Sequence, residues 1–259
     1  MTDTEKAREL YGRVKASGLY DRELGMYKLN VSLEDEPLEI GRSRAFTPGW
    51  LENESIWLHM EYKYLLEALK CGLYAEFFAD IEKALIPFQD AARYGRSILE
   101  NSSFLTPSCF FDRDLIGSGF YARLSGATVE FLHMLHIMNL GLHPFALEEG
   151  RLVFKPSPIL KKEFFSREGR TVEFAFKKGP RQVKLPPNSY AFSIFSKTLV
   201  VYENPRGKDT FGSTPVRSAR YSVRYAGGRE KAVEGRSLGE PFSKDLRAGL
   251  VDQVTVLLD

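Results

Sequence analysis

The sequence predicts an α+β protein in which helices precede strands. Apolar residues recur at the 3.6-residue period of helices in the first part of the chain, and beyond Pro144 they follow the two-residue alternation of strands. A run of helices followed by a run of strands is typical of an α+β fold or of two separate domains. We therefore expect a helical domain over residues 1–150 and a β-domain over residues 151–259.

The helical part is predicted to contain four helices, over residues 3–17, 54–70, 73–86 and 125–140. The second is apolar on two sides, with one stripe of Leu58, Tyr62, Leu65 and Leu69 and another of Ile56, Trp57, Met60 and Tyr64. The fourth has a predicted apolar stripe of Val129, Leu132, Leu135 and Met138. Gly72 separates the second helix from the third, so these two should form an antiparallel hairpin, the unit of helical toroids and bundles.

The β-part is predicted to hold short strands with hairpin turns at Ser196-Lys197 and Gly227-Gly228. The expected strands are Arg151–Lys155, Thr171–Lys177, Tyr190–Phe195, Thr198–Glu203, Ala219–Tyr225 and Val254–Leu258. Several short strands at such spacing suggest an antiparallel β-sandwich.

Composition excludes several classes of function. Thirty-six basic and 34 acidic residues leave a net charge of +2, which indicates neither nucleic acid nor a membrane surface as a partner. No signal peptide or spanning segment is recognisable, so a cytoplasmic location is expected. The two cysteines, Cys71 and Cys109, lack metal-site spacing.

The segment from Arg42 to Glu67 carries the clearest signs of a site, because a polar loop leads into a buried helix. His59, near the start of that helix, is suited to bind an anion or a sugar. The local residues also allow a core histidine, with Glu52 to Ser55 merely capping the helix, and on composition alone this structural role is favoured.

Ser125 and Gly126 open the fourth helix with a hydroxyl and backbone N–H groups that could hold phosphate, or they form an ordinary helix cap. Glu52, Glu54 and Glu100 could form a glycosidase pair, although isolated glutamates are mostly solvated. His133 and His136 could bind a metal, but no carboxylate or thiol completes the set, so no metal is predicted. No GxSxG, HExxH or GxGxxG motif is present.

Three ordered segments resemble a known family: PGWLENESIWLH at residues 48–59, GRSILENSSF at 95–104 and GFYARLSGATVEFLHM at 119–134. They are similar to the C-terminal half of the inverting β-glucan phosphorylases, the cellobiose phosphorylase-like enzymes of glycoside hydrolase family 94, and most to the 1,2-β-oligoglucan phosphorylase branch. The resemblance implies part of an (α/α)6 toroid followed by a β-sandwich. It also implies reversible phosphorolysis of β-glucosides to α-glucose 1-phosphate, with inorganic phosphate as co-substrate and no cofactor.

By this resemblance, His59, Ser125 and Gly126 correspond to the family's phosphate-binding residues, with serine standing where threonine is usual. Glu52 corresponds to a sugar-contacting glutamate, and Glu100, within the second segment, is the other residue predicted to bind substrate. The resemblance therefore favours the functional role of His59 over the structural one.

The family's general acid, an aspartate in a GDWND-like segment, has no counterpart here. The resemblance thus implies a glycosyltransferase that is inactive without an N-terminal partner, with β-glucan oligosaccharide and phosphate as ligands and an N-terminal half or a second copy as protein partner. Two alternatives stay open: a non-catalytic carbohydrate-binding remnant, and a truncated product whose exposed helical faces promote association.

Overall fold

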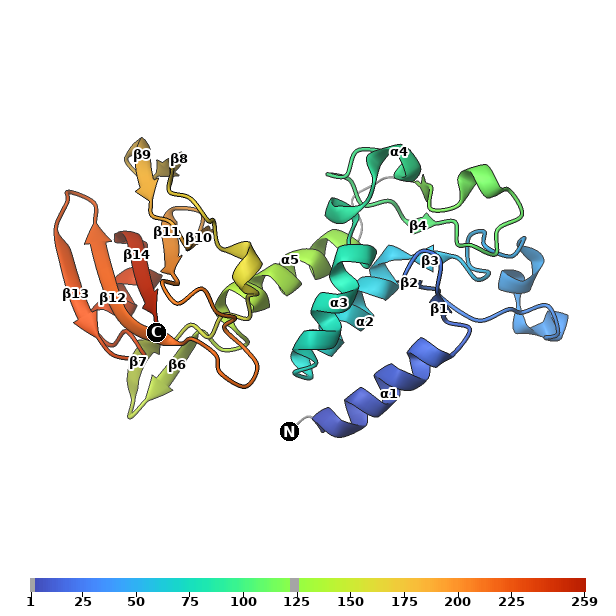
Figure 1. The fold of residues 1–259 in the computed structure, drawn as a ribbon, viewed down its shortest axis with the longest axis horizontal. Helices are drawn as coiled ribbons and strands as arrows, with labels where there is room; N and C mark the ends of the chain where they lie inside the picture. Colours follow the sequence, from blue (N-terminus) through green and yellow to red (C-terminus); the bar gives the residue numbers. More distant parts are fainter. Residues whose placement is uncertain (1–2, 122–125) are drawn as a thin grey trace. The chain divides into compact units, whose positions relative to one another are not determined.

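The computed structural model describes residues 3–121 and 126–259, which form two compact units, Met1–Leu135 and His136–Asp259. Helices dominate the first unit, and strands dominate the second (Figure 1). The α+β class predicted from the sequence is confirmed, with a multistranded, mostly antiparallel sheet. The two units divide inside a helix rather than near residue 150.

The first unit contains most of the helices and two small sheets. Its longer helices are α1 (Thr4–Ala16), α2 (Leu58–Lys70), α3 (Tyr74–Ala84) and the first part of α5 (Gly126–Leu140), with a single turn at α4 (Ala91–Tyr94). Short 3-10 helices are η1 (Leu38–Ile40), η2 (Arg42–Ala45), η3 (Ile86–Phe88) and η4 (Arg113–Leu115). One sheet pairs β1 (Tyr20–Asp21) with β2 (Met26–Tyr27), and the other has the order β3 (Ile56–Trp57), β4 (Phe104–Leu105), β5 (Gly119–Phe120).

The helical hairpin of α2 and α3 supplies the core of this unit. The stripe predicted on α2, Leu58, Tyr62, Leu65 and Leu69, is buried, as are Phe77, Phe78 and Ile81 of α3. The second predicted stripe is only partly right: Tyr64 packs against Tyr27, but Met60 is 44% exposed, and Ile56 and Trp57 belong to strand β3. Helix α2 therefore begins at Leu58, four residues later than predicted, and Trp57 rather than Glu52 to Ser55 stands before its first turn.

The stripe predicted on α5 is also partly wrong. Val129 and Leu132 are 64% and 59% exposed, whereas Ala127 and Met134 are buried. This helix carries apolar residues on nearly every side, so its periodicity does not select the face that packs. Among the described residues, no helix combines the length and hydropathy required to cross a membrane.

The second unit is built on a five-stranded sheet in the order β10-β11-β14-β12-β13, in which only the β11–β14 pair is parallel. These strands are β10 (Ser189–Ile194), β11 (Thr198–Glu203), β12 (Ser218–Tyr225), β13 (Glu230–Glu234) and β14 (Val251–Leu258). The unit also contains two hairpins, each a separate two-stranded sheet: β6 (Phe145–Glu148) with β7 (Arg151–Phe154), and β8 (Arg170–Phe176) with β9 (Gly179–Leu185). Its short helices are η5 (Lys162–Phe164) and α6 (Phe242–Arg247). All six predicted strands and both predicted hairpin turns are present, whereas β6, β9 and β13 were not predicted.

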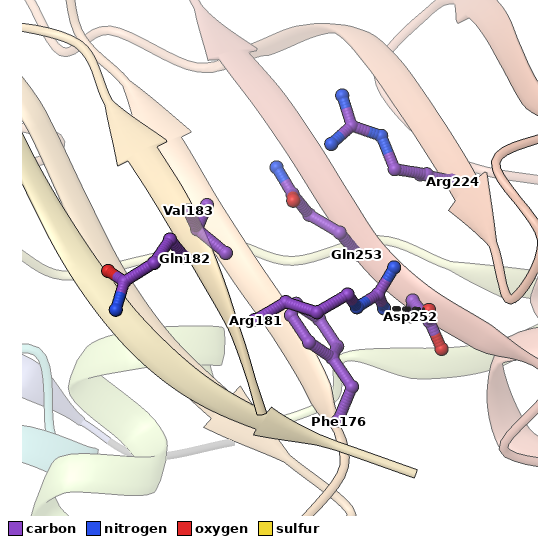
Figure 2. A pocket seen from close by; sticks show the side chains of 7 residues that line it. All are labelled: Phe176, Arg181, Gln182, Val183, Arg224, Asp252 and Gln253. Carbon is purple, nitrogen blue, oxygen red and sulfur yellow. Dashed lines mark hydrogen bonds and ion pairs between the residues drawn. The ribbon is translucent and has the colours of Figure 1, made fainter. Parts of the chain in front are cut away.

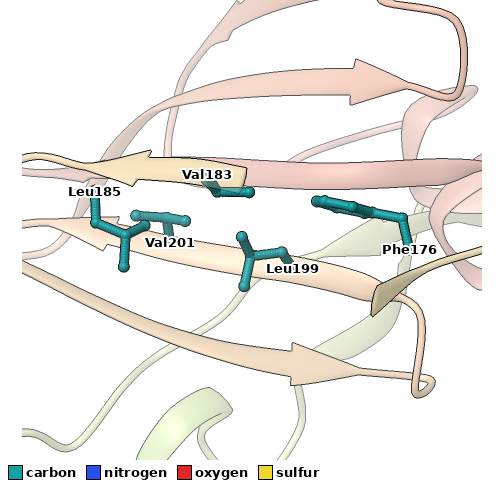
Figure 3. Close-up of a cluster of buried hydrophobic side chains, with 5 residues drawn as sticks. All are labelled: Phe176, Val183, Leu185, Leu199 and Val201. Atoms are coloured by element: carbon teal, nitrogen blue, oxygen red, sulfur yellow. The ribbon is translucent and has the colours of Figure 1, made fainter. Parts of the chain in front are cut away.

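The hairpin of β8 and β9 packs on β11 through a buried apolar cluster. Figure 3 shows its five side chains facing one another between the two layers: Phe176, Val183, Leu185, Leu199 and Val201. Alternate residues of each strand point into this cluster, which is why the period-two pattern identified these strands in the sequence.

Candidate functional site

The three-stranded sheet of the first unit adjoins the start of α2 and precedes α5 in the chain. Strand β3 leads directly into α2, and β5 lies on the other side of the central strand β4 and precedes α5. The N–H of Leu58 donates to the carbonyl of Ser103 (3.2 Å), and the N–H of Ser103 donates to the carbonyl of Phe120 (2.9 Å). The start of α2 is therefore hydrogen-bonded to this sheet, and α5 follows its last strand in the chain.

His59 and Gly126, predicted from the sequence to belong to one site, are in direct contact. His59 is the second residue of α2, and Gly126 is the first described residue of α5. A Cβ atom on residue 126 would lie 2.1 Å from Cε1, 2.3 Å from Nε2 and 2.5 Å from Nδ1 of the imidazole. Only glycine allows the ring to lie this close to the backbone of α5. Ser125, the third residue of the predicted phosphate group, lies outside the described residues.

Glu130 also reaches His59, although the sequence did not single it out. Its Oε1 lies 3.4 Å from Nε2 of the imidazole, and the two side chains are 17% and 33% exposed. Residues 126 and 130 are four apart on α5 and so share one face of the helix. That spacing from the glycine is the signal by which Glu130 could have been found.

A chain of hydrogen bonds ties α5 to the α2–α3 hairpin beside His59. The N–H of Ile86 donates to the hydroxyl of Tyr62 (3.0 Å), which donates to Oδ1 of Asn101 (3.2 Å). Nδ2 of Asn101 in turn donates to Oγ1 of Thr128 on α5 (3.2 Å). Burial raises the pKa of Tyr62 far above its ordinary value, so the hydroxyl stays neutral and can donate.

Glu52 is held by Arg42 rather than by the helix that follows it. Nε of Arg42 lies 2.9 Å from Oε2 of Glu52, and Nη2 contacts Oε1. This hydrogen bonding from Arg42 lowers the pKa of the Glu52 carboxyl, which is therefore an anion at neutral pH. The backbone carbonyl of Glu52 accepts from Nδ2 of Asn30 (2.8 Å).

The neighbouring Glu54 is buried and lies 2.7 Å from Nζ of Lys28, which is buried almost as deeply. Glu100 is exposed, and its backbone carbonyl accepts from the hydroxyl of Tyr94 (2.9 Å). In the segment 95–104 it is thus Asn101, rather than Glu100, whose side chain connects to α5.

Within the part of the chain that the structure describes, no group of three or more histidine, cysteine, aspartate or glutamate side chains could hold a metal ion. A small hollow in the second unit is lined by residues of the β8–β9 hairpin and of strands β12 and β14, among them Arg181, Arg224 and Asp252 (Figure 2). Its volume is about 50 Å³. That is a third of the roughly 150 Å³ in which benzene is accommodated, so it does not enclose a sugar ring.

Comparison with known proteins adds no further constraint, since no family model matches this chain and no curated protein matches it. The candidate site is therefore defined by its geometry. An imidazole packed on a glycine at one helix start, beside a second helix start, is suited to bind a small anion.

Proposed function

We propose that this chain forms the phosphate-binding side of the active site of an inverting β-glucan phosphorylase. The observation that carries the proposal is the packing of His59 on Gly126 at the starts of α2 and α5. The positive ends of both helix dipoles favour an anion there, and the imidazole adds a ring nitrogen that can share a hydrogen with it. Inorganic phosphate is the anion that the resemblance of these segments implies.

In this proposal the bound phosphate oxygen attacks the anomeric carbon of a β-glucoside. The glycosidic C–O bond breaks, α-glucose 1-phosphate forms, and a carboxylic acid protonates the leaving oxygen. Phosphate is already nucleophilic, so no second carboxylate has to act as a base. The residues of this chain bind and orient phosphate, Glu52 contacts the sugar, and the acid comes from a polypeptide that carries the GDWND-like segment.

The same proposal extends to the fold. The α2–α3 hairpin and α5 would belong to an (α/α)6 toroid, and the β-unit would be its C-terminal sandwich. Helix α5 supports this assignment, because its exposed Val129 and Leu132 form an apolar surface that further helices of a toroid would cover.

The test is phosphate binding followed by ³¹P NMR or calorimetry, with His59→Ala as the variant and His133→Ala as its control. His133 is an exposed histidine on α5, so its loss leaves the site unchanged. We expect saturable binding to the native chain and to His133→Ala, and a loss of at least about tenfold in His59→Ala. Equal affinity in all three proteins would refute the proposal.

Catalysis is assayed separately, as release of glucose 1-phosphate from short β-1,2-glucans with and without a polypeptide that carries the acid. The second candidate function is glycan binding without turnover. Calorimetry with sophorose-type oligosaccharides separates the two, because glycan binding that is independent of phosphate and of His59 supports the second.

A further inference from the structure

Glu130 holds a defined position relative to the imidazole of His59. Its Oε1 lies 3.4 Å from Nε2, at the edge of the ring, whereas Gly126 lies against the face of the ring. Both contacts come from one face of α5, one helical turn apart. The glutamate side chain is 17% exposed, so it is partly withdrawn from water and has less freedom to turn away.

These contacts restrict the ring in two ways. The face contact with Gly126 fixes the plane of the imidazole, and the edge contact with Glu130 fixes its rotation within that plane. A carboxylate can only accept, so the contact requires that Nε2 carry the hydrogen. The tautomer of a histidine is set by the partner of one ring nitrogen, and the other nitrogen is then left for a ligand.

We propose that Glu130 is a positioning residue that orients His59 for phosphate, an inference that rests on the proposed function of this site. Glu130 accepts the hydrogen of Nε2, which leaves Nδ1 with its lone pair to accept the hydrogen of a protonated phosphate oxygen. The carboxylate does not itself bind phosphate, because two anions in contact repel. Thr128, bonded to Asn101, holds the same turn of α5 in place.

The experiment uses the full chain and two readouts. The first is the ¹⁵N chemical shifts of the His59 ring without phosphate, assigned with His59→Ala, which report the nitrogen that carries hydrogen. The second is the dissociation constant for inorganic phosphate. The variants are Glu130→Leu, which removes the acceptor, and Glu130→Gln, which keeps an acceptor oxygen at nearly the same place.

In Glu130→Leu we expect the ring shifts to lose the signature of a hydrogen fixed on Nε2 and phosphate affinity to fall about tenfold. In Glu130→Gln the Nε2 signature should persist, and affinity should stay within about threefold of the native value. Glu130→Asp, which retracts the carboxylate by one methylene, should behave like Glu130→Leu and replaces it if leucine unfolds the chain.

The two proposals fail in distinguishable ways. Native ring shifts and native affinity in Glu130→Leu would overturn the role of Glu130 and leave phosphate binding by His59 intact. A native chain that binds no phosphate, while Glu130→Leu still changes the ring shifts, would overturn the proposed function and support the positioning contact alone.

Discussion

The imidazole of His59 lies so close to Gly126 that a single added carbon would overlap three of its atoms. Real Cβ atoms essentially never approach a heavy atom within 3.0 Å, and here the nearest distance would be 2.1 Å. The glycine is therefore required by the contact between α2 and α5. Its role is steric, since it lets the ring reach the backbone.

Gly126→Ala should displace the His59 ring, and this overpacking should cost about 1–3 kcal/mol of unfolding free energy, against a gain of about 1 kcal/mol from helix propensity. It should also weaken phosphate binding, because the imidazole leaves its place between the helix starts. Urea unfolding and phosphate titration check the two effects.

Gly12→Ala is the matched control, because Gly12 lies in α1 with nothing within 4 Å of its added Cβ. It should raise the free energy of unfolding by about 0.5–1 kcal/mol, through helix propensity alone. If Gly126→Ala were as stable as Gly12→Ala, the steric argument would be wrong.

Asp80 is a second point at which one side chain joins several elements. It is buried and accepts hydrogen bonds from the hydroxyls of Tyr11 (2.9 Å) and Tyr27 (2.5 Å) and from Nζ of Lys15 (2.6 Å). Helix α1 has no buried residue of its own, so two of these bonds are among its main attachments. Asp80→Ala should cost about 3 kcal/mol of unfolding free energy, because it leaves buried donors without an acceptor.

Hydrogen exchange distinguishes this mechanism from a general loss of stability. The amides of α1 should exchange faster in Asp80→Ala than those of α2 and α3, since α1 is released first. Glu39→Ala, a change at an exposed acidic residue, serves as the control and should leave exchange unchanged. Uniform acceleration across all three helices would contradict the attachment role.

The buried carboxyl of Glu61 should make the free energy of unfolding depend on pH. Burial raises the pKa of its carboxyl well above the ordinary value, and the nearby Asp80 raises it further, whereas the bond from the N–H of Tyr27 (2.9 Å) opposes the shift. Its second oxygen has no hydrogen-bond partner among the described residues. The folded state therefore keeps a proton that the unfolded state has lost, and stability falls as pH rises from the unfolded pKa of about 4.3 toward the folded pKa.

Glu61→Gln has no proton to lose at this position, so the variant should gain stability relative to the native chain as pH rises above about 5. Each unit by which the folded pKa exceeds the unfolded one corresponds to about 1.4 kcal/mol at high pH. Urea unfolding at several pH values between about 5 and 8 measures the difference between the two slopes. Parallel curves would show that the carboxyl does not titrate as its burial predicts.

Secondary structure was largely predictable because both halves of the chain show clear periodicity. The start of α2 was misplaced because Ile56 and Trp57 are apolar at helical spacing, although they pair with β4. A two-residue strand leaves no periodic signal, and its existence depends on Phe104 and Leu105, some fifty residues later. The packing face of α5 was missed for the opposite reason, since apolar residues surround the helix.

The candidate site was predictable only where a motif carried it. His59 and Gly126 came from segments that resemble a family, and the structure brings them together. Asn101 has no local signature, because its partner Thr128 lies far along the sequence, and the spacing of Glu130 from Gly126 does not by itself reveal its contact with His59. Glu52 could be named, but its bidentate contact with Arg42 depends on how the loop folds.

The last prediction concerns the ion pair of Arg181 and Asp252 in the second unit. The guanidinium lies 4.1 Å above the ring of Phe176 and contacts the carboxylate of Asp252, whose side chain is only 5% exposed (Figure 2). The arginine side chain is 45% exposed, so the two partners differ in burial, and removing the arginine chiefly destabilises the buried carboxylate of Asp252. Arg181→Met should therefore lower the free energy of unfolding by about 2–4 kcal/mol, because it leaves a buried charge unpaired.

The double variant Arg181→Met/Asp252→Leu should recover much of that loss, since a buried ion pair is often replaceable by apolar side chains of similar size. Lys178→Met, in the exposed turn between β8 and β9, controls for the loss of a positive charge and should be nearly neutral. Urea unfolding of the native chain, Arg181→Met, Asp252→Leu and the double variant gives the coupling energy directly. Additive losses in the double variant would mean that Arg181 stabilises the hairpin through its contact with Phe176 and not by pairing with Asp252.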